Sequence, residues 1–267
     1  MTTPPSTTAP TASRGRLDPV LADHVMDALH LAGLPIAHGG HGPGVHLRPA
    51  EPLDDNDDCH GLIALHWLPS RRLAHAAATE QHKQPAHAAQ QLVVNAVQHT
   101  LTVLLPLLGT TADRAFHLWE VRVTAAEPLP RELTGLPGPR PSGPAPIAPG
   151  IRPDVITAVR HSAALAGLPV ATHPGDPGIT LRPCPPLDPG DDTTGIADLG
   201  WNPSRRLAAA ATGHAAWNLR AAVEEAVRQA LPVALGACGL DVWWRRPDGL
   251  PPQLRAYGPS EDPPIRR

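Results

Sequence analysis

Two copies of a Ser-Arg-Arg tripeptide are the residues of this chain best placed to do chemistry. They are Ser70, Arg71 and Arg72 in the first half of the 267 residues, and Ser204, Arg205 and Arg206 in the second. An Ala- and Leu-rich segment follows each copy, which predicts a helix that the serine caps at its N-terminus. The unbonded N–H groups of a helix start, together with two guanidinium groups, attract phosphate or carboxylate. The sequence therefore predicts that these six residues bind an anion or a partner.

An internal ion pair is the alternative role of the four arginines. A cation in the first turn of a helix opposes the helix macrodipole by about 0.3–1 kcal/mol per charge, so an offsetting interaction is expected. Two acidic pairs precede the arginines at equivalent places: Asp57 and Asp58 in the first half, and Asp191 and Asp192 in the second. These aspartates are the expected partners if the arginines are structural. The sequence leaves both roles open.

The segments that position these residues also occur twice. Residues 32–74 align with residues 166–208 at a constant offset of 134, and 24 of the 43 aligned pairs are identical. The repeat separates positions that both copies share from positions at which they differ. It therefore gives an internal comparison of two versions of one structural unit.

Each repeat predicts the element order α-β-β-β-α-β. The amphipathic first helix ends at Gly33 or Gly167, and both glycines are typical C-caps. The third strand is indicated by alternation, because one face is apolar in both copies and the other face differs. The long second helix begins at Ser-Arg-Arg, is broken by Pro85 in the first copy, and ends near Gly109 or Gly236. The expected strands are 35–38, 45–48, 61–67 and 116–123 in the first copy, and 169–172, 179–182, 195–201 and 240–245 in the second.

The fold class that this order predicts is α+β, as a tandem duplication with helices packed on one face of a small, mostly antiparallel sheet. Near-identical surfaces predict that the two units dock as a pseudo-dimer, and independent units on a linker are the alternative. Segments rich in Pro, Gly, Thr and Ser indicate the boundaries. They give a disordered tail at 1–16, repeat unit 1 at 17–124, a Pro/Gly-rich linker at 125–150, repeat unit 2 at 151–250 and a Pro-rich tail at 251–267.

Composition restricts the class of function. The formal net charge of −3 provides no global basic field, so any binding of nucleic acid must be local. Three cysteines without metal-ligand spacing favour a reducing compartment. The N-terminus lacks the apolar segment of a signal peptide, and the most apolar stretch, 101–108, is far shorter than the ~20 residues of a membrane span. We expect a cytoplasmic protein without a membrane partner, and the Arg-rich, Lys-poor composition is typical of a high-GC bacterial coding sequence.

The sequence contains no motif typical of catalysis or of cofactor binding. There is no Gly-x-Ser-x-Gly elbow, no phosphate-binding or dinucleotide-binding glycine motif, and no His-Glu-x-x-His or Cys-x-x-Cys metal motif. We therefore assign no catalytic residue and expect no metal or cofactor. Trp67 and Trp201 occupy equivalent positions, and we predict that both face the core, with a ligand-facing or interface position as the alternative.

One family resemblance bears on the arginines. The string from Ser204 to Ala211 and the order α-β-β-β-α resemble the double-stranded-RNA-binding domain. That family has a Ser-Lys-Lys-x-Ala-type start on its second helix, where basic residues contact phosphates across the major groove. The resemblance implies such a contact for Arg205 and Arg206. The chain departs from the pattern by having arginine for lysine, a longer helix and an added terminal strand.

Together these features predict a non-enzymatic, cytoplasmic, tandem-repeat protein that acts as a binding or adaptor module for an unidentified protein partner. Binding of nucleic acid or a phosphate ligand through the arginine pairs is the alternative. A third hypothesis is an enzyme with an unfamiliar Asp/His/Arg site in unit 1. Ionic strength separates the first two, because phosphate contacts weaken steeply with added salt.

Overall fold

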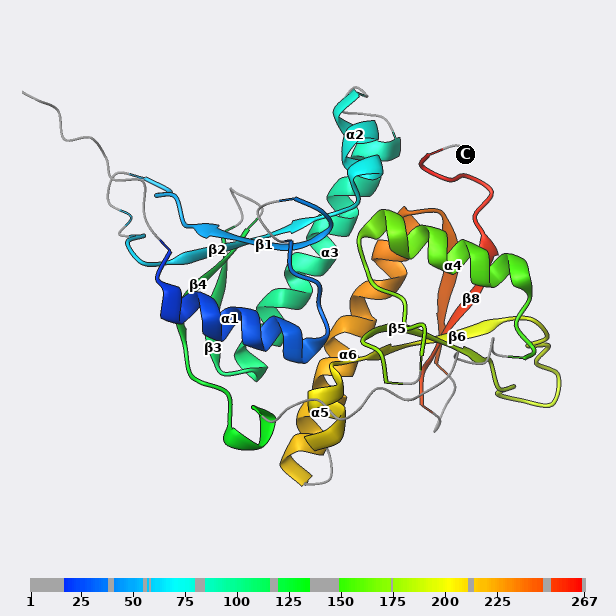
Figure 1. The fold of residues 1–267 in the computed structure, drawn as a ribbon. Coiled ribbons are helices and arrows are strands. Elements are labelled where there is room, and N and C mark those ends of the chain that lie inside the picture. Colours follow the sequence, from blue (N-terminus) through cyan, green and yellow to red (C-terminus); the bar gives the residue numbers. More distant parts are fainter. Residues whose placement is uncertain are drawn as a thin grey trace, which may run out of the picture.

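A computed structural model of the chain describes residues 17–37, 41–54, 57, 59–79, 85–115, 120–134, 149–173, 175–210, 214–246 and 251–265 (Figure 1). Both halves have one order of elements: a helix, two strands, two helices and two strands. Unit 1 consists of α1 (Pro19–Ala32), β1 (Gly44–Pro49), β2 (Ile63–Leu68), α2 (Arg71–Thr79), α3 (Pro85–Leu107), β3 (Thr110–Ala115) and β4 (Glu120–Ala126). Unit 2 consists of α4 (Pro153–Ala166), β5 (Gly178–Pro183), β6 (Ala197–Asn202), α5 (Arg205–Ala210), α6 (His214–Ala237), β7 (Leu240–Arg245) and β8 (Gln253–Pro259).

Each unit forms one four-stranded antiparallel sheet, in the orders β1-β2-β4-β3 and β5-β6-β8-β7. Helices pack on these sheets, which confirms the predicted α+β class with two similar halves. The predicted face of the third strand is also confirmed, because Ile63, Leu65 and Trp67 are fully buried. Gly33 ends α1 in the left-handed conformation, at φ 80°, as its predicted role as a C-cap requires.

The predicted order of strands within a unit is wrong in two places. Residues 35–37 and 169–172 form no strand but only isolated parallel bridges, Ile36 with Val45 and Val170 with Ile179, and residue 38 lies outside the described residues. The single final strand is instead a pair of strands in both units. In unit 1 the predicted strand 116–123 lies across the junction of β3 and β4, and residues 116–119 lie outside the described residues. Alternation of apolar and polar residues indicates single strands but not their partners. It therefore did not reveal that β3 pairs with a following strand, β4, and β7 with β8.

The segment assigned as a Pro-rich tail contains β8, which lies between β6 and β7 in the sheet. Leu254 and Ala256 of this strand are fully buried. Prolines stand before β8 and at its last position rather than in its middle, where a missing N–H would break the ladder. The prediction of a tail at 251–267, which relied on its proline content, is therefore wrong for the residues that form this central strand.

The two units dock on one another, as the pseudo-dimer prediction requires. The long helices α3 and α6 pack together between the two sheets, with unit 1 in blue to green and unit 2 in green to red (Figure 1). A single hydrophobic core includes buried residues of both units, among them Leu101 of α3 and Leu231 of α6. Continuous burial across the junction favours a fixed pair of units over independent ones.

Candidate functional site

The two equivalent tryptophans lie in the junction between the units. The Trp67 indole N–H donates to the carbonyl of Ala166 at 3.0 Å, and that of Trp201 donates to the carbonyl of Ala32 at 2.9 Å. Each carbonyl is the last of a helix in the other unit, where no intrahelical donor remains. The two bonds are related by the same offset of 134 as the sequence repeat, so the junction has an approximate two-fold symmetry.

The backbone of the Ser-Arg-Arg tripeptides joins the same junction. The N–H of Ser70 donates to the Leu165 carbonyl and that of Ser204 to the Leu31 carbonyl, both at 3.0 Å. The hydroxyls of both serines cap their helices, with Oγ accepting from the N–H of Leu73 or of Leu207 at 3.2 and 3.3 Å. The N-cap prediction is therefore confirmed. The Ser-Arg-Arg segment, which is identical in the two copies, therefore forms hydrogen bonds that hold the two units together.

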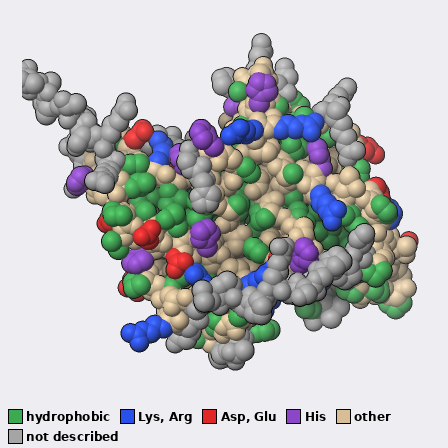
Figure 2. Space-filling view, in the orientation of Figure 1, with side chains coloured by type: hydrophobic (Ala, Val, Ile, Leu, Met, Phe, Trp, Pro, Cys, Tyr) green, Lys and Arg blue, Asp and Glu red, His purple; other side chains and the backbone are tan. Residues whose placement is uncertain are grey.

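The four arginines of the tripeptides have different surroundings in the two units. In unit 2, Arg205 pairs with Asp176, and Arg206 reaches across the junction to Asp27 of α1, with 3.0 Å between Nη1 and Oδ1. In unit 1, Arg71 and Arg72 are exposed, and neither forms an ion pair with any residue in the described ranges. The offset of 134 explains the difference, since the counterparts of the two acids are Gly42 and His161. Figure 2 shows Lys and Arg side chains on the surface at the base of α2, with histidines nearby.

The acidic residues expected to neutralise these arginines lie elsewhere. Asp57 pairs with Arg122 of β4 at 2.6 Å, and Asp191 pairs with Arg255 of β8 through both carboxylate oxygens. Asp192 accepts from the N–H of Thr194 at 3.0 Å and so stabilises its own loop, whereas Asp58 lies outside the described residues. Sequence proximity suggested the wrong arginines, because the strand that carries the true partner follows more than 60 residues later.

The Asp191–Arg255 pair predicts an acid-dependent stability. Hydrogen bonds from Arg255, followed by one from the Leu187 N–H, hold the pKa of Asp191 well below its ordinary value. A depressed folded-state pKa stabilises the protein above the unfolded-state pKa of about 3.9, and this contribution is lost as the pH falls below it. We expect the free energy of unfolding to decrease between pH 5 and pH 3, and Arg255→Met to show a smaller decrease.

Denaturant unfolding of both proteins at several pH values in that range measures this effect. Arg131→Met is the matched control, because Arg131 is exposed and is not among the groups that act on the pKa of Asp191. An Arg255→Met protein that lost as much stability in acid as the parent would contradict the assignment.

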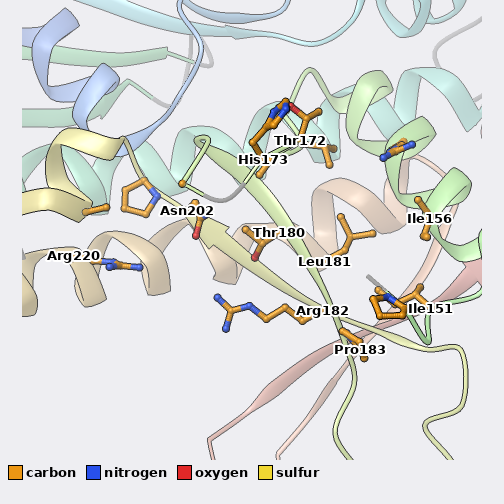
Figure 3. Close-up of a pocket in the computed structure, with 17 residues that line it drawn as sticks. Ile151, Ile156, Thr172, His173, Thr180, Leu181, Arg182, Pro183, Asn202 and Arg220 are labelled. Carbon is orange, nitrogen blue, oxygen red and sulfur yellow. The ribbon is translucent and has the colours of Figure 1, made fainter. Parts of the chain in front are cut away.

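A cavity of about 680 Å³ lies along β5 in unit 2 (Figure 3). We call it the β5 cavity. Ile156 and Val170 form part of its apolar lining, and Thr180 and Asn202 form part of its polar lining. Its charged lining consists of three arginines from three elements: Arg160 of α4, Arg182 of β5 and Arg220 of α6.

The arginines of the β5 cavity are poorly neutralised. No carboxylate is among its described lining residues, although Glu224 pairs with Arg220 from outside, at 2.6 Å between Oε1 and Nε. Arg160 and Arg182 are exposed, and within the described ranges neither forms an ion pair, although Arg182 lies opposite Asp198 in the β5–β6 pair and the two charges attract. Figure 3 shows Arg182 extending from β5 and Arg220 on α6. Three guanidinium groups around a cavity whose described lining holds no carboxylate favour an anionic ligand.

The corresponding place in unit 1 lacks this charge. The counterpart of Arg160 is Met26, and that of Arg220, at the later offset of 126, is Val94. Arg48 is the counterpart of Arg182, but its guanidinium is bonded to Glu51 and Glu120, both at 2.8 Å. Unit 2 has Pro185 and Gln253 at the places of those two glutamates, as the strand register and repeat offset show. Among the described residues, this cluster of arginines is therefore found in unit 2 and not at the equivalent place in unit 1.

Sequence reasoning missed the β5 cavity because it looked for function in positions that the copies share. The cavity is indicated instead by positions at which the copies differ, where unit 2 has an arginine and unit 1 has an apolar residue. Comparison of the chain with family models, with curated protein sequences and with solved structures finds no match. Within the described ranges, no helix combines the length and apolar character of a membrane crossing.

Proposed function

We propose that this protein is a non-enzymatic, cytoplasmic binding protein that holds an anionic group of a partner protein in the β5 cavity. The observation that carries the proposal is the group of three arginines around a cavity whose described lining includes no carboxylate. A guanidinium group binds carboxylate or phosphate through two parallel hydrogen bonds, which gives affinity and orientation together. The volume and the mixed apolar and polar lining are also those of a ligand site.

His173 lines the cavity as part of a hydrogen-bonded turn. Nδ1 of its ring contacts both the Thr172 hydroxyl, at 3.0 Å, and Asp176, at 3.1 Å. The backbone N–H of His173 also donates to Asp176, at 3.0 Å, and Arg205 forms an ion pair with the same carboxylate. These contacts of Asp176 stabilise the turn that contributes His173 to the cavity wall.

The cysteines support the proposed compartment. All three are unpaired thiols, and burial raises the pKa of the Cys238 thiol to about 12. Burial also raises the pKa of Cys184. Protonated, buried thiols are inert structural residues, which is what a reducing cytoplasm favours.

The proposal predicts that the cavity arginines determine anion affinity. Changing Arg160→Met and Arg182→Gln together removes two charge-assisted interactions, each worth about 1.5–3 kcal/mol, so affinity for an acidic peptide should fall at least tenfold. Isothermal titration with a glutamate-rich peptide, with citrate and with inorganic phosphate measures this. Arg71→Gln with Arg72→Gln is the matched control, because it removes the same charge from an exposed place outside the cavity.

The two double variants also distinguish the second candidate function. Arg71 and Arg72 form no ion pair in the described part of the chain, which keeps binding of nucleic acid or phosphate open for unit 1. Affinity lost only in the Arg71/Arg72 variant, and decreasing steeply with salt, would support that alternative against ours. Failure of the parent protein to bind any of the three anions would contradict the β5 cavity proposal outright.

A further inference from the structure

We infer that the β5 cavity binds an extended acidic peptide, which adds to the sheet as a strand beside β5. This inference rests on the proposed function and names the chemistry of its ligand. The observations that carry it are the state of the β5 edge, the faces on which the arginines lie, and the contrast with unit 1.

The described residues cover the edge of β5 over part of its length only. β5 is the outermost strand of its sheet, with β6 on one side. On the other side, the N–H of Ile179 donates to the Pro169 carbonyl, and the Ile179 carbonyl accepts from the N–H of Ala171, both at 2.9 Å. In an antiparallel pair, hydrogen-bonding direction alternates along a strand, so Leu181 points its N–H and carbonyl toward the same side as Ile179.

Nothing in the described part of the chain bonds to the outward N–H and carbonyl of Leu181. Leu181 lines the β5 cavity, and so do its neighbours Arg182 and Pro183. Pro183 carries no N–H, and its place on an edge strand, facing outward, is where a proline is tolerated. The cavity therefore presents one complete backbone donor–acceptor pair, which is the unit by which an added strand is recognised.

The arginines lie on both sides of that edge. Arg160 extends from α4, the helix that packs on the inner face of the sheet. Arg182 alternates with Ile179 and Leu181, which face the core, and so belongs to the outer face. Successive side chains of an added strand also alternate between the two faces. Two adjacent acidic residues would therefore place one carboxylate near Arg160 and the next near Arg182.

Unit 1 shows that the edge alone does not define the site. Leu47 on β1 is the counterpart of Leu181, and Val45 is bonded to Pro35 and Ala37 just as Ile179 is bonded to its neighbours. The charge is missing, however, because Met26 replaces Arg160 and two glutamates bind Arg48. An acidic peptide thus has a backbone partner in both units but a charge partner only in unit 2. The chain's own segment 135–148 contains no Asp or Glu and lacks the complementary charge.

Amide hydrogen exchange of the full-length protein tests the inference. The probe is a peptide of about six residues with two adjacent glutamates flanked by valine and threonine, and citrate is the small-anion comparison. Binding of the peptide should slow exchange of the Leu181 N–H at least tenfold and leave that of Leu47 unchanged, because only Leu181 gains a carbonyl partner. Citrate should leave both amides unchanged.

Backbone-methylated peptides provide the second readout. Two versions of the probe carry N-methyl groups on alternate amides, so that one version blocks one edge of the strand and the other blocks the opposite edge. Strand addition requires that one version bind at least tenfold more weakly than the other. Equal affinity of both versions, with no protection of Leu181, would overturn strand addition while leaving the anion site intact. Loss of all binding, including that of citrate, would instead overturn the proposed function.

Discussion

Replacement of Trp67 by Ala is expected to lower the free energy of unfolding by about 3–5 kcal/mol, the usual cost of removing a buried tryptophan. Trp67 is fully buried and Trp201 nearly so, at 3% exposed. The change removes packing from unit 1 and at the same time leaves the Ala166 carbonyl of unit 2 without its donor. Because the junction is two-fold, Trp201→Ala should have a similar cost. Denaturant unfolding, followed by circular dichroism and by fluorescence, measures both.

The matched control for this prediction is Trp243→Ala. Trp243 is 65% exposed on β7, so its removal should change stability by no more than about 0.5 kcal/mol. The milder change Trp67→Phe isolates the hydrogen bond and should cost about 1–3 kcal/mol. A Trp67→Ala protein as stable as the control would show that the junction contributes little to folding. The docked arrangement of the units would then lose its energetic basis.

Local patterns in the sequence were sufficient to predict much of the fold. Alternation identified the buried face of β2, and glycine followed by Leu-Pro identified the ends of α1 and α4. These features depend on neighbours within a few residues. The prediction failed where pairing is remote: β8 joins β6 across more than 50 residues, and only tertiary contact makes a strand of that proline-flanked segment.

The candidate site illustrates the same limit. Identity between the copies led to Ser70 and Ser204, and the structure places both in the junction. A two-fold junction requires each copy to supply both sides of the contact, so both copies retain the same residues there. A ligand site in one copy has no such requirement. Arg160 has Met26 as its counterpart, and Arg182 has Arg48, which is paired with Glu120. These residues of the site therefore stand out by how the two copies differ, not by what they share.

The energetic role of the junction can be separated from that of backbone conformation with two glycines. Gly33 and Gly61 have almost the same φ, 80° and 79°, in the left-handed region that disfavours a side chain. A Cβ on Gly61 would meet nothing within 4 Å. A Cβ on Gly33 would lie 2.9 Å from Cβ of Pro177 and 3.1 Å from the Asn202 carbonyl oxygen, both in the other unit. Gly61→Ala should therefore cost about 1–2 kcal/mol, from the backbone alone.

Gly33→Ala should cost about 1–3 kcal/mol more than Gly61→Ala, because the added methyl group must also force the two units apart. The counterpart Gly167→Ala should behave like Gly33→Ala, since its Cβ would lie 2.8 Å from Cβ of Pro43 in unit 1. Denaturant midpoints of the three variants measure the difference directly. Equal losses at Gly33 and Gly61 would mean that the units yield at their junction without cost. An excess loss at both Gly33 and Gly167 would mean that the repeat is retained in both copies because each copy is the packing surface of the other.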